Sequence, residues 1–145
     1  MDSYSPRIRI SKMAMEVLMK SLLFTLALLL GSSAFGLENV TDADYYKKVS
    51  CSEGLTLVDF YADWCGACKM VHPVLEKLEK EYKGKIKFYQ IDTDKSPKTS
   101  AYFSIRYIPT IFIFKNGGNP QEIQNAPEDI MREQINNAVK TLEKK

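Results

Sequence analysis

The sequence has few of the residues that metal clusters and disulfide-stapled domains need. Its 145 residues include three cysteines and one histidine. Three cysteines are too few for a small domain held together by disulfides. A structural zinc site takes four ligands, whereas Cys65, Cys68 and His72 offer three. A c-type haem attachment would need histidine where Lys69 stands. We therefore expect neither a metal nor a cofactor.

The sequence also lacks an excess of charge of either sign. The formal net charge is +2, and four basic and two acidic residues lie among the first 36. The rest of the chain carries sixteen residues of each sign, which gives no electrostatic reason to expect nucleic acid as a partner. An apolar fraction of 45% is ordinary for a globular protein. The length and composition predict one folded, monomeric domain.

The one long apolar run near the N-terminus is Ser21–Leu30, preceded by a lysine and followed by small residues. This order of charged, apolar and small segments is typical of a secretory signal peptide. Cleavage after Gly36 is favoured slightly over cleavage after Ala34. The alternative is an uncleaved membrane anchor, for which Val17–Leu37 is just long enough.

These patterns divide the chain into residues 1–36, a signal peptide or N-terminal anchor, and residues 37–145, the folded domain. Either fate of the first segment places the domain outside the cytoplasm. We therefore expect a periplasmic or otherwise extracytoplasmic protein that is either free or anchored to a membrane.

Periodicity in residues 37–145 predicts alternating helices and strands. Apolar stripes at helical spacing mark two long helices, and near-continuous apolar runs mark strands that are covered on both faces. The pattern predicts an α/β fold in which a central mixed sheet has helices on both faces. The expected helices are 44–49 (capped by Thr41 or Asp42), 65–82, 97–103 (capped by Ser96) and one from 127. The expected strands are 55–62, 86–92, 110–114 and 122–124, the last after a hairpin turn at Asn116-Gly117.

The pair Cys65 and Cys68 lies where the first strand turns into the long helix. Unpaired N–H groups and the positive end of the helix dipole stabilise an anion at a helix start, and the thiolate is the reactive form of cysteine. Cys68 lies one turn further along and is expected to be more buried. We infer that Cys65 attacks a substrate disulfide and that Cys68 resolves the mixed disulfide.

Two further features support dithiol chemistry. Asp59 lies six residues before Cys65 in an apolar strand, so that burial should raise its pKa and let it accept the proton of Cys68. Pro109 precedes a predicted strand, at the position where a missing N–H does no harm. The third cysteine, Cys51, stands alone, and we expect it to be buried or partly buried as a small apolar residue.

Together these motifs resemble the thioredoxin family, over about residues 39–142. The resemblance is carried by Trp64-Cys65-Gly66-Ala67-Cys68-Lys69, Asp59, the helix proline Pro73, Ile108-Pro109-Thr110 and Phe114-Lys115-Asn116-Gly117. It implies a thioredoxin fold, a redox-active Cys65–Cys68 disulfide and a cis Ile108–Pro109 bond. It also implies a substrate groove lined by Trp64, Gly66, Ala67, Ile108, Pro109 and the loop near Asn125–Ala126.

The sequence departs from the family pattern at three positions. Common thioredoxins carry proline where Ala67 stands and often a lysine, facing the buried acid, where Phe88 stands. The late loop glycine corresponds to Asn125. The neighbouring Lys87 should point to the opposite face of the sheet, and without the cation Asp59 should have a still higher pKa.

The resemblance implies a thiol–disulfide oxidoreductase that reduces disulfides in extracytoplasmic client proteins. Such a reductase would be recharged by a membrane electron donor, such as a DsbD/CcdA-like thiol transporter. The alternatives are a disulfide oxidase or isomerase and a non-catalytic binding module with the same fold. Oxidases and isomerases of this kind usually carry an inserted helical domain, for which Ile91–Thr110 leaves no room.

Overall fold

The structure is a computed structural model that describes Glu16 and residues 36–144. The predicted signal peptide or anchor, residues 1–36, lies outside the described residues apart from Glu16 and Gly36. Within the described part of the chain, no helix is both long enough and apolar enough to cross a membrane.

A five-stranded mixed sheet forms the centre of the folded unit, with the strand order β1-β3-β2-β4-β5. The first three strands in this order are parallel, β4 pairs antiparallel with β2, and β5 pairs antiparallel with β4. This confirms the predicted mixed sheet. The strands are β1 (Glu38–Asn39), β2 (Leu55–Tyr61), β3 (Ile86–Asp92), β4 (Thr110–Lys115) and β5 (Gln121–Ile123).

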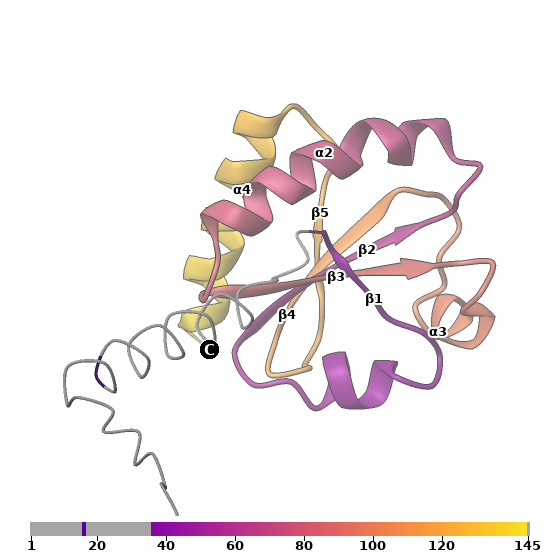
Figure 1. Ribbon diagram of the computed structural model, residues 1–145, viewed down its shortest axis with the longest axis horizontal. Helices are drawn as coiled ribbons and strands as arrows, with labels where there is room; N and C mark the ends of the chain where they lie inside the picture. The colour runs from indigo at the N-terminus through magenta and orange to yellow at the C-terminus, as the bar shows by residue number, and fades with distance from the viewer. Residues whose placement is uncertain (1–15, 17–35, 145) are drawn as a thin grey trace, which may run out of the picture. The chain divides into compact units, whose positions relative to one another are not determined.

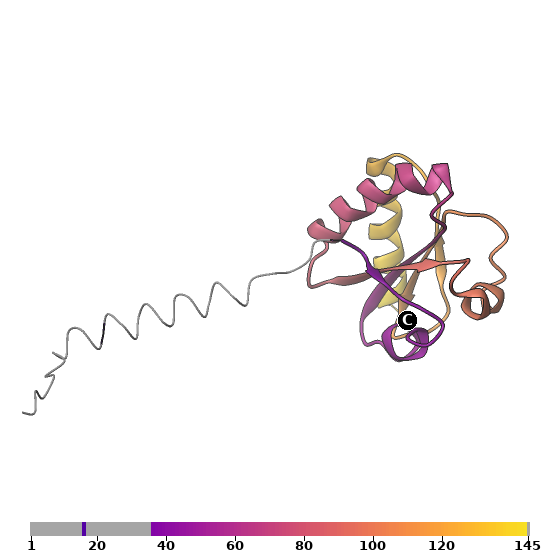
Figure 2. The ribbon, with the colours of Figure 1, turned by 45° about the vertical axis from the view of Figure 1, so that its right-hand side comes forward.

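Helices cover both faces of the sheet, as predicted (Figure 1). The long helices α2 (Gly66–Glu81) and α4 (Glu128–Glu143) lie together on one face. The single helical turn η1 (Tyr46–Ser50) and α3 (Pro97–Tyr102) lie on the other. Figure 2, turned by 45°, shows the same division of the helices.

Two apolar cores result, one on each side of the sheet. The apolar stripe predicted for the first long helix is confirmed, because Val71, Leu75, Leu78 and Tyr82 are buried and Val74 packs at the margin. On this side the core joins α2 and α4 to the sheet through Leu57, Phe88, Ile111, Ile113, Met131 and Ile135, among others. On the other side it contains Val49, Val58, Phe60, Ile91 and Phe114, with Phe103 packed against them.

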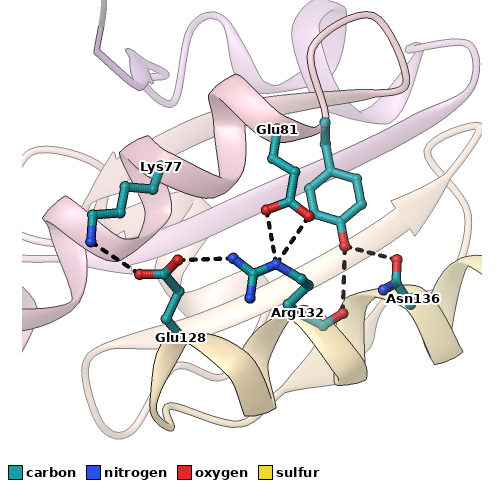
Figure 3. Close-up of polar contacts among 6 residues, drawn as sticks. Lys77, Glu81, Glu128, Arg132 and Asn136 are labelled. Carbon is teal, nitrogen blue, oxygen red and sulfur yellow. Dashed lines mark hydrogen bonds and ion pairs between the residues drawn. The ribbon is translucent and has the colours of Figure 1, made fainter.

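A polar network ties α2 to α4 across their exposed surfaces (Figure 3). Arg132 is its centre, since it pairs with Glu81 and with Glu128, both at 2.8 Å. Glu128 also binds Lys77 at 3.1 Å. The hydroxyl of Tyr82 donates to the side chain of Asn136 at 2.8 Å. Exposed ion pairs add little free energy individually, so the network chiefly orients the two helices that the apolar core holds together.

The fold differs from the sequence predictions in its shortest elements. The strand β1 was not predicted, because two exposed residues carry no periodicity. The expected helix 44–49 is a single π-type turn, in which the N–H of Cys51 bonds the carbonyl of Tyr46 five residues earlier. The final hairpin strand begins one residue before the predicted 122–124, and Asn116 and Gly117 both have the positive φ that their turn requires.

Ser96 is the N-cap residue of α3 and Pro97 opens the helix, as predicted, but the Ser96 side chain does not cap it. The Ser96 hydroxyl makes no capping bond, and its oxygen has no partner among the described residues. The cap comes instead from Asp42, whose carboxylate accepts from the N–H groups of Lys98 and Thr99 and from the Thr99 hydroxyl, at 3.1, 2.8 and 2.7 Å. Desolvation acts to raise the pKa of Asp42, but these hydrogen bonds outweigh it and hold the pKa below its usual value. The segment before η1 is thereby fastened to α3.

The prediction for Cys51 was also wrong, because this cysteine is exposed. It follows η1 directly, and Val49 is the buried residue of that turn. A turn of five residues has one side that faces the core, and Cys51 falls on the side away from it.

Candidate active site

The two cysteines of the central motif form a disulfide at the N-terminus of α2, with their Cα atoms 5.3 Å apart. Cys65 is the N-cap residue, and its sulfur accepts a hydrogen bond from the backbone N–H of Cys68 at 3.1 Å. The expected contrast in burial is small, because the two side chains are 6% and 3% exposed. The two cysteines differ in position, because the sulfur of Cys65 accepts a hydrogen bond from an N–H group at the helix terminus, whereas Cys68 lies within the helix.

The side chains next to Cys65 in the sequence are either exposed or small. Trp64 is 69% exposed, and its indole N–H donates to Asp94 Oδ2 at 2.8 Å, which fixes the ring. Gly66 is exposed and Ala67 half-buried, so neither covers the sulfurs with a large side chain.

The loop before β4 approaches the disulfide from the opposite direction. The Ile108–Pro109 bond is cis, as the resemblance implied. The carbonyl oxygen of Ile108 lies 3.9 Å from the sulfur of Cys65. A disulfide sulfur has no proton to donate, so this is a contact in the oxidised state, and the reduced Cys65 thiol would have an acceptor there. The hydroxyl of Thr110 donates to the carbonyl of Tyr107 at 2.6 Å and holds the loop closed.

Asp59 lies beneath the pair, in the middle of β2. Its side chain is 1% exposed, and its Oδ1 atom has no hydrogen-bond partner among the described residues. Burial raises its pKa from 3.8 to about 7. Asp59 and Cys68 both line a cavity of about 330 Å³, so the carboxyl and the inner cysteine border the same space. This group can therefore be either an acid or a base near neutral pH.

The family model for thioredoxin matches residues 36–140, which is most of the chain. The chain belongs to the thioredoxin family. Its relatives include thioredoxin M4, chloroplastic, of Arabidopsis thaliana, which is 40% identical over 105 residues, 72% of this chain and 54% of that protein. The chain thus spans about half the length of this plant relative.

Two bacterial thioredoxins match a shorter segment at higher identity. The thioredoxin of Rickettsia felis is 47% identical over 79 residues, which is 54% of this chain and 75% of that protein. A thioredoxin of Staphylococcus aureus is 49% identical over 78 residues, or 54% of this chain and 73% of that protein.

The main departure from thioredoxins lies beside the buried acid. Phe88 lies two register positions away from Asp59, and thus on the same face of the sheet, because Leu57 pairs with Phe88 and Asp59 with Gln90. The phenyl ring is buried and stacks on Tyr82, with ring centroids 6.5 Å apart. Lys87 is exposed and reaches the carbonyl of Glu53 instead. The position that often supplies a cation in thioredoxins therefore supplies an apolar ring here.

Sequence reasoning missed Gln90 as a site residue. It lies opposite Asp59 in the sheet and lines the same cavity, and its side-chain amide donates to Asn39 at 3.0 Å. Only the pairing of β2 with β3 brings these residues together, and no local pattern signals it. Of the loop predicted to line the groove, Asn125 is exposed and Ala126 packs partly against the core.

His72, considered above as a third metal ligand, also lines this cavity. One ring nitrogen lies 3.4 Å from Glu76 Oε1, one turn further along α2. Among the described residues, no three His, Cys, Asp or Glu side chains are grouped as a metal ion would require.

Proposed function

We propose that this chain is a thiol–disulfide oxidoreductase that reduces disulfides of client proteins through Cys65 and Cys68. The observation that carries the proposal is the Cys65–Cys68 disulfide at the N-cap of α2, with Asp59 in the cavity that Cys68 lines. Membership of the thioredoxin family supports the same chemistry.

In the reduced protein, the Cys65 thiolate attacks one sulfur of a client disulfide and releases the other as a client thiolate. The hydrogen bond from the Cys68 N–H and the positive end of α2 favour this thiolate. Cys68 then transfers its proton to Asp59 and attacks the sulfur of Cys65. The second client thiolate leaves, the client has gained two electrons, and the protein holds the disulfide.

The surface beside Cys65 is proposed to receive an extended segment of the client. Trp64, held by Asp94, would bound it on one side, and the Ile108–Pro109 loop on the other. Gly66 and Ala67 lack side chains that would block the approach. Backbone groups of the loop would bind the client in a way that is tolerant of its sequence.

We further propose that the domain works outside the cytoplasm and receives electrons from a membrane thiol transporter. Support comes from the sequence of residues 1–36, with its short apolar run and the small residues that follow. In an oxidising compartment the disulfide is not reduced by a cytosolic pool, so a dedicated donor is needed. Fractionation of cells that express the full chain tests the location, and N-terminal sequencing of the mature protein tests cleavage after Gly36.

Disulfide oxidation or isomerisation is the rival activity. Between β3 and β4 the chain holds only α3 and its loops, without an added helical domain, and this favours a reductase. The reduction potential decides between them: a value near about −270 mV supports a reductase and one near about −120 mV an oxidant.

The dithiol assignment is tested by reduction of insulin with dithiothreitol as the electron source. We expect activity in the wild type and its loss in Cys65→Ser, whereas Cys51→Ser should keep it because Cys51 lies outside the site. Activity that survives Cys65→Ser would refute the assignment of catalysis to Cys65, and a wild type without activity would favour the non-catalytic binding module. Asp59→Asn should slow the resolution of mixed disulfides by Cys68, and unchanged resolution would remove Asp59 from the mechanism.

A further inference from the structure

The two residues before Cys65 are held by two successive residues that follow β3. The indole N–H of Trp64 donates to Asp94 at 2.8 Å, and the Asp63 carboxylate pairs with Lys95 at 3.0 Å. Asp63 and Trp64 are both exposed, so apolar packing does little to fix their side chains. The orientation of these side chains therefore depends on polar contacts with the segment after β3.

Asp92, the last residue of β3, holds both of these partners. One of its carboxylate oxygens accepts the backbone N–H of Asp94 at 3.0 Å, and the other accepts the ammonium of Lys95 at 2.6 Å. Its backbone carbonyl also accepts the N–H groups of Lys95 and Ser96, at 3.2 and 2.9 Å. One side chain thus fixes both residues that contact Asp63 and Trp64.

The setting of Asp92 differs from that of an ordinary surface ion pair. Its side chain is 7% exposed, whereas those of Lys95 and Asp63 are 66% and 72% exposed. Desolvation acts to raise the pKa of Asp92, but the hydrogen bonds from Lys95 and from the Asp94 N–H outweigh it and hold the pKa below its usual value. The group is therefore ionised at neutral pH. Its hydrogen bonds are stronger than they would be in water, because little solvent competes for them.

We propose that Asp92 is a positioning residue for client binding. Through Asp94 it fixes the indole of Trp64. Through Lys95 it fixes Asp63, one residue earlier in the chain. The inference rests on the proposed function, in which Trp64 bounds the surface that receives the client. A side chain that is already held in place loses less conformational entropy when a client binds against it.

The backbone of the same two segments has a support that does not involve the Asp92 carboxylate. The N–H and the hydroxyl of Thr93 both donate to the carbonyl of Tyr61, at 2.9 and 3.1 Å. These bonds hold the end of β2 against the segment after β3, but they do not reach the side chains of Asp63 and Trp64. Replacement of Asp92 should therefore loosen these side chains while the backbone pairing persists.

The test compares the rate constants with which the reduced full chain reacts with insulin and with hydroxyethyl disulfide. The small disulfide has no peptide chain to rest against Trp64, so its rate constant reports the Cys65 thiolate alone. The ratio of the two rate constants therefore reports client binding, because a change in thiolate reactivity cancels. Trp64 is the only tryptophan of the chain, so its stopped-flow fluorescence follows both reactions and its anisotropy measures the mobility of the ring.

We expect Asp92→Ala to lower this ratio by roughly two- to tenfold, the effect of one further side chain that must be ordered on binding. The anisotropy of Trp64 should fall with it. Asp94→Ala, which removes the partner of the indole directly, should have the same two effects. Asp92→Asn should recover most of the loss, because its side-chain oxygen still accepts from the Asp94 N–H. The matched control Lys98→Met, on α3, should leave the ratio and the anisotropy at their wild-type values.

Two results would overturn the positioning role: a wild-type ratio and anisotropy in Asp92→Ala, or an asparagine variant that recovers nothing. If Asp92→Ala does not fold, Lys95→Met tests the same contact from its exposed end. It should lower the ratio, and a ratio equal to that of Lys98→Met would refute the role. A wild type that reduces neither disulfide would refute the proposed function itself, whereas normal reduction with an unchanged ratio in the variants refutes the positioning role alone.

Discussion

Replacement of Asp59 by asparagine should change how stability depends on pH. Burial raises the pKa of this carboxyl from 3.8 to about 7 in the folded protein. Below pH 3.8 the group is protonated in both states, and the full stability is present. As the pH rises, the unfolded chain loses its proton first while the folded protein keeps it until about pH 7. Stability therefore falls from about pH 4 to 7 and levels off above about pH 8.

The magnitude follows from the two pKa values. Each pKa unit corresponds to about 1.36 kcal/mol, so the whole loss is about 4 kcal/mol, of which about 3 kcal/mol falls between about pH 5 and pH 8.5. The asparagine of the variant does not titrate. Any fixed cost of burying its amide is the same at both pH values and cancels in the comparison. The variant should thus gain about 3 kcal/mol relative to wild type across this range.

Urea unfolding of the oxidised proteins at about pH 5 and pH 8.5 measures this effect. The disulfide must be intact, because free thiols would add ionisable groups of their own to the comparison. With an m-value of about 2 kcal/mol per molar urea, the urea midpoint of Asp59→Asn minus that of wild type should increase by about 1.5 M between the two pH values. A difference that stays constant over this pH range would show that Asp59 is ionised in the folded protein and would refute the argument from burial.

Three further predictions concern the surroundings of the site and the turns of the fold. Phe88→Lys should lower the pKa of Asp59 by about one unit or more, through a cation on the same face of the sheet; an unchanged carboxyl titration by NMR would contradict this. Gly117→Ala should destabilise the protein by clearly more than the roughly 1 kcal/mol expected for Gly54→Ala in urea unfolding. Both glycines have positive φ, but only at Gly117 would a Cβ collide with a backbone carbonyl, so equal losses would rule out the clash. Asp42→Ala should lower the midpoint of thermal unfolding at neutral pH. The difference in midpoint between wild type and variant should shrink as the pH falls below the pKa of the carboxyl, because a protonated Asp42 no longer caps α3. A difference in midpoint that is independent of pH would exclude the cap.

Most of the fold was predictable because the long elements carry their own periodicity. The stripes on α2 and α4 repeat over several turns, β2 and β4 are near-continuous apolar runs, and β3 shows alternation. The elements that were missed or misjudged are short. The two residues of β1 and the single turn η1 contain too few positions for a pattern to emerge.

The residues of the site also divide into those that local sequence predicts and those that it does not. Asp59, Cys65, Cys68 and His72 fall within fourteen consecutive residues that run from β2 into α2, so their spacing alone brings them near one another. A strand followed directly by a helix has little freedom in how its residues are arranged. The sequence by itself therefore determined the disulfide pair, its position at a helix start and the carboxyl beside it.

The family resemblance anticipated Phe88 near the acid and the Ile108–Pro109 loop near the cysteines, but only the tertiary structure supplied their contacts and added Gln90. The pairing of β2 with β3 places Gln90 opposite Asp59 and Phe88 where a cation often lies in thioredoxins. The fold brings the Ile108 carbonyl to Cys65 and the Asp42 carboxylate to the start of α3. Each of these contacts joins residues that are far apart along the chain. Their geometry depends on the packing and register of the whole sheet, which no local stretch of sequence encodes.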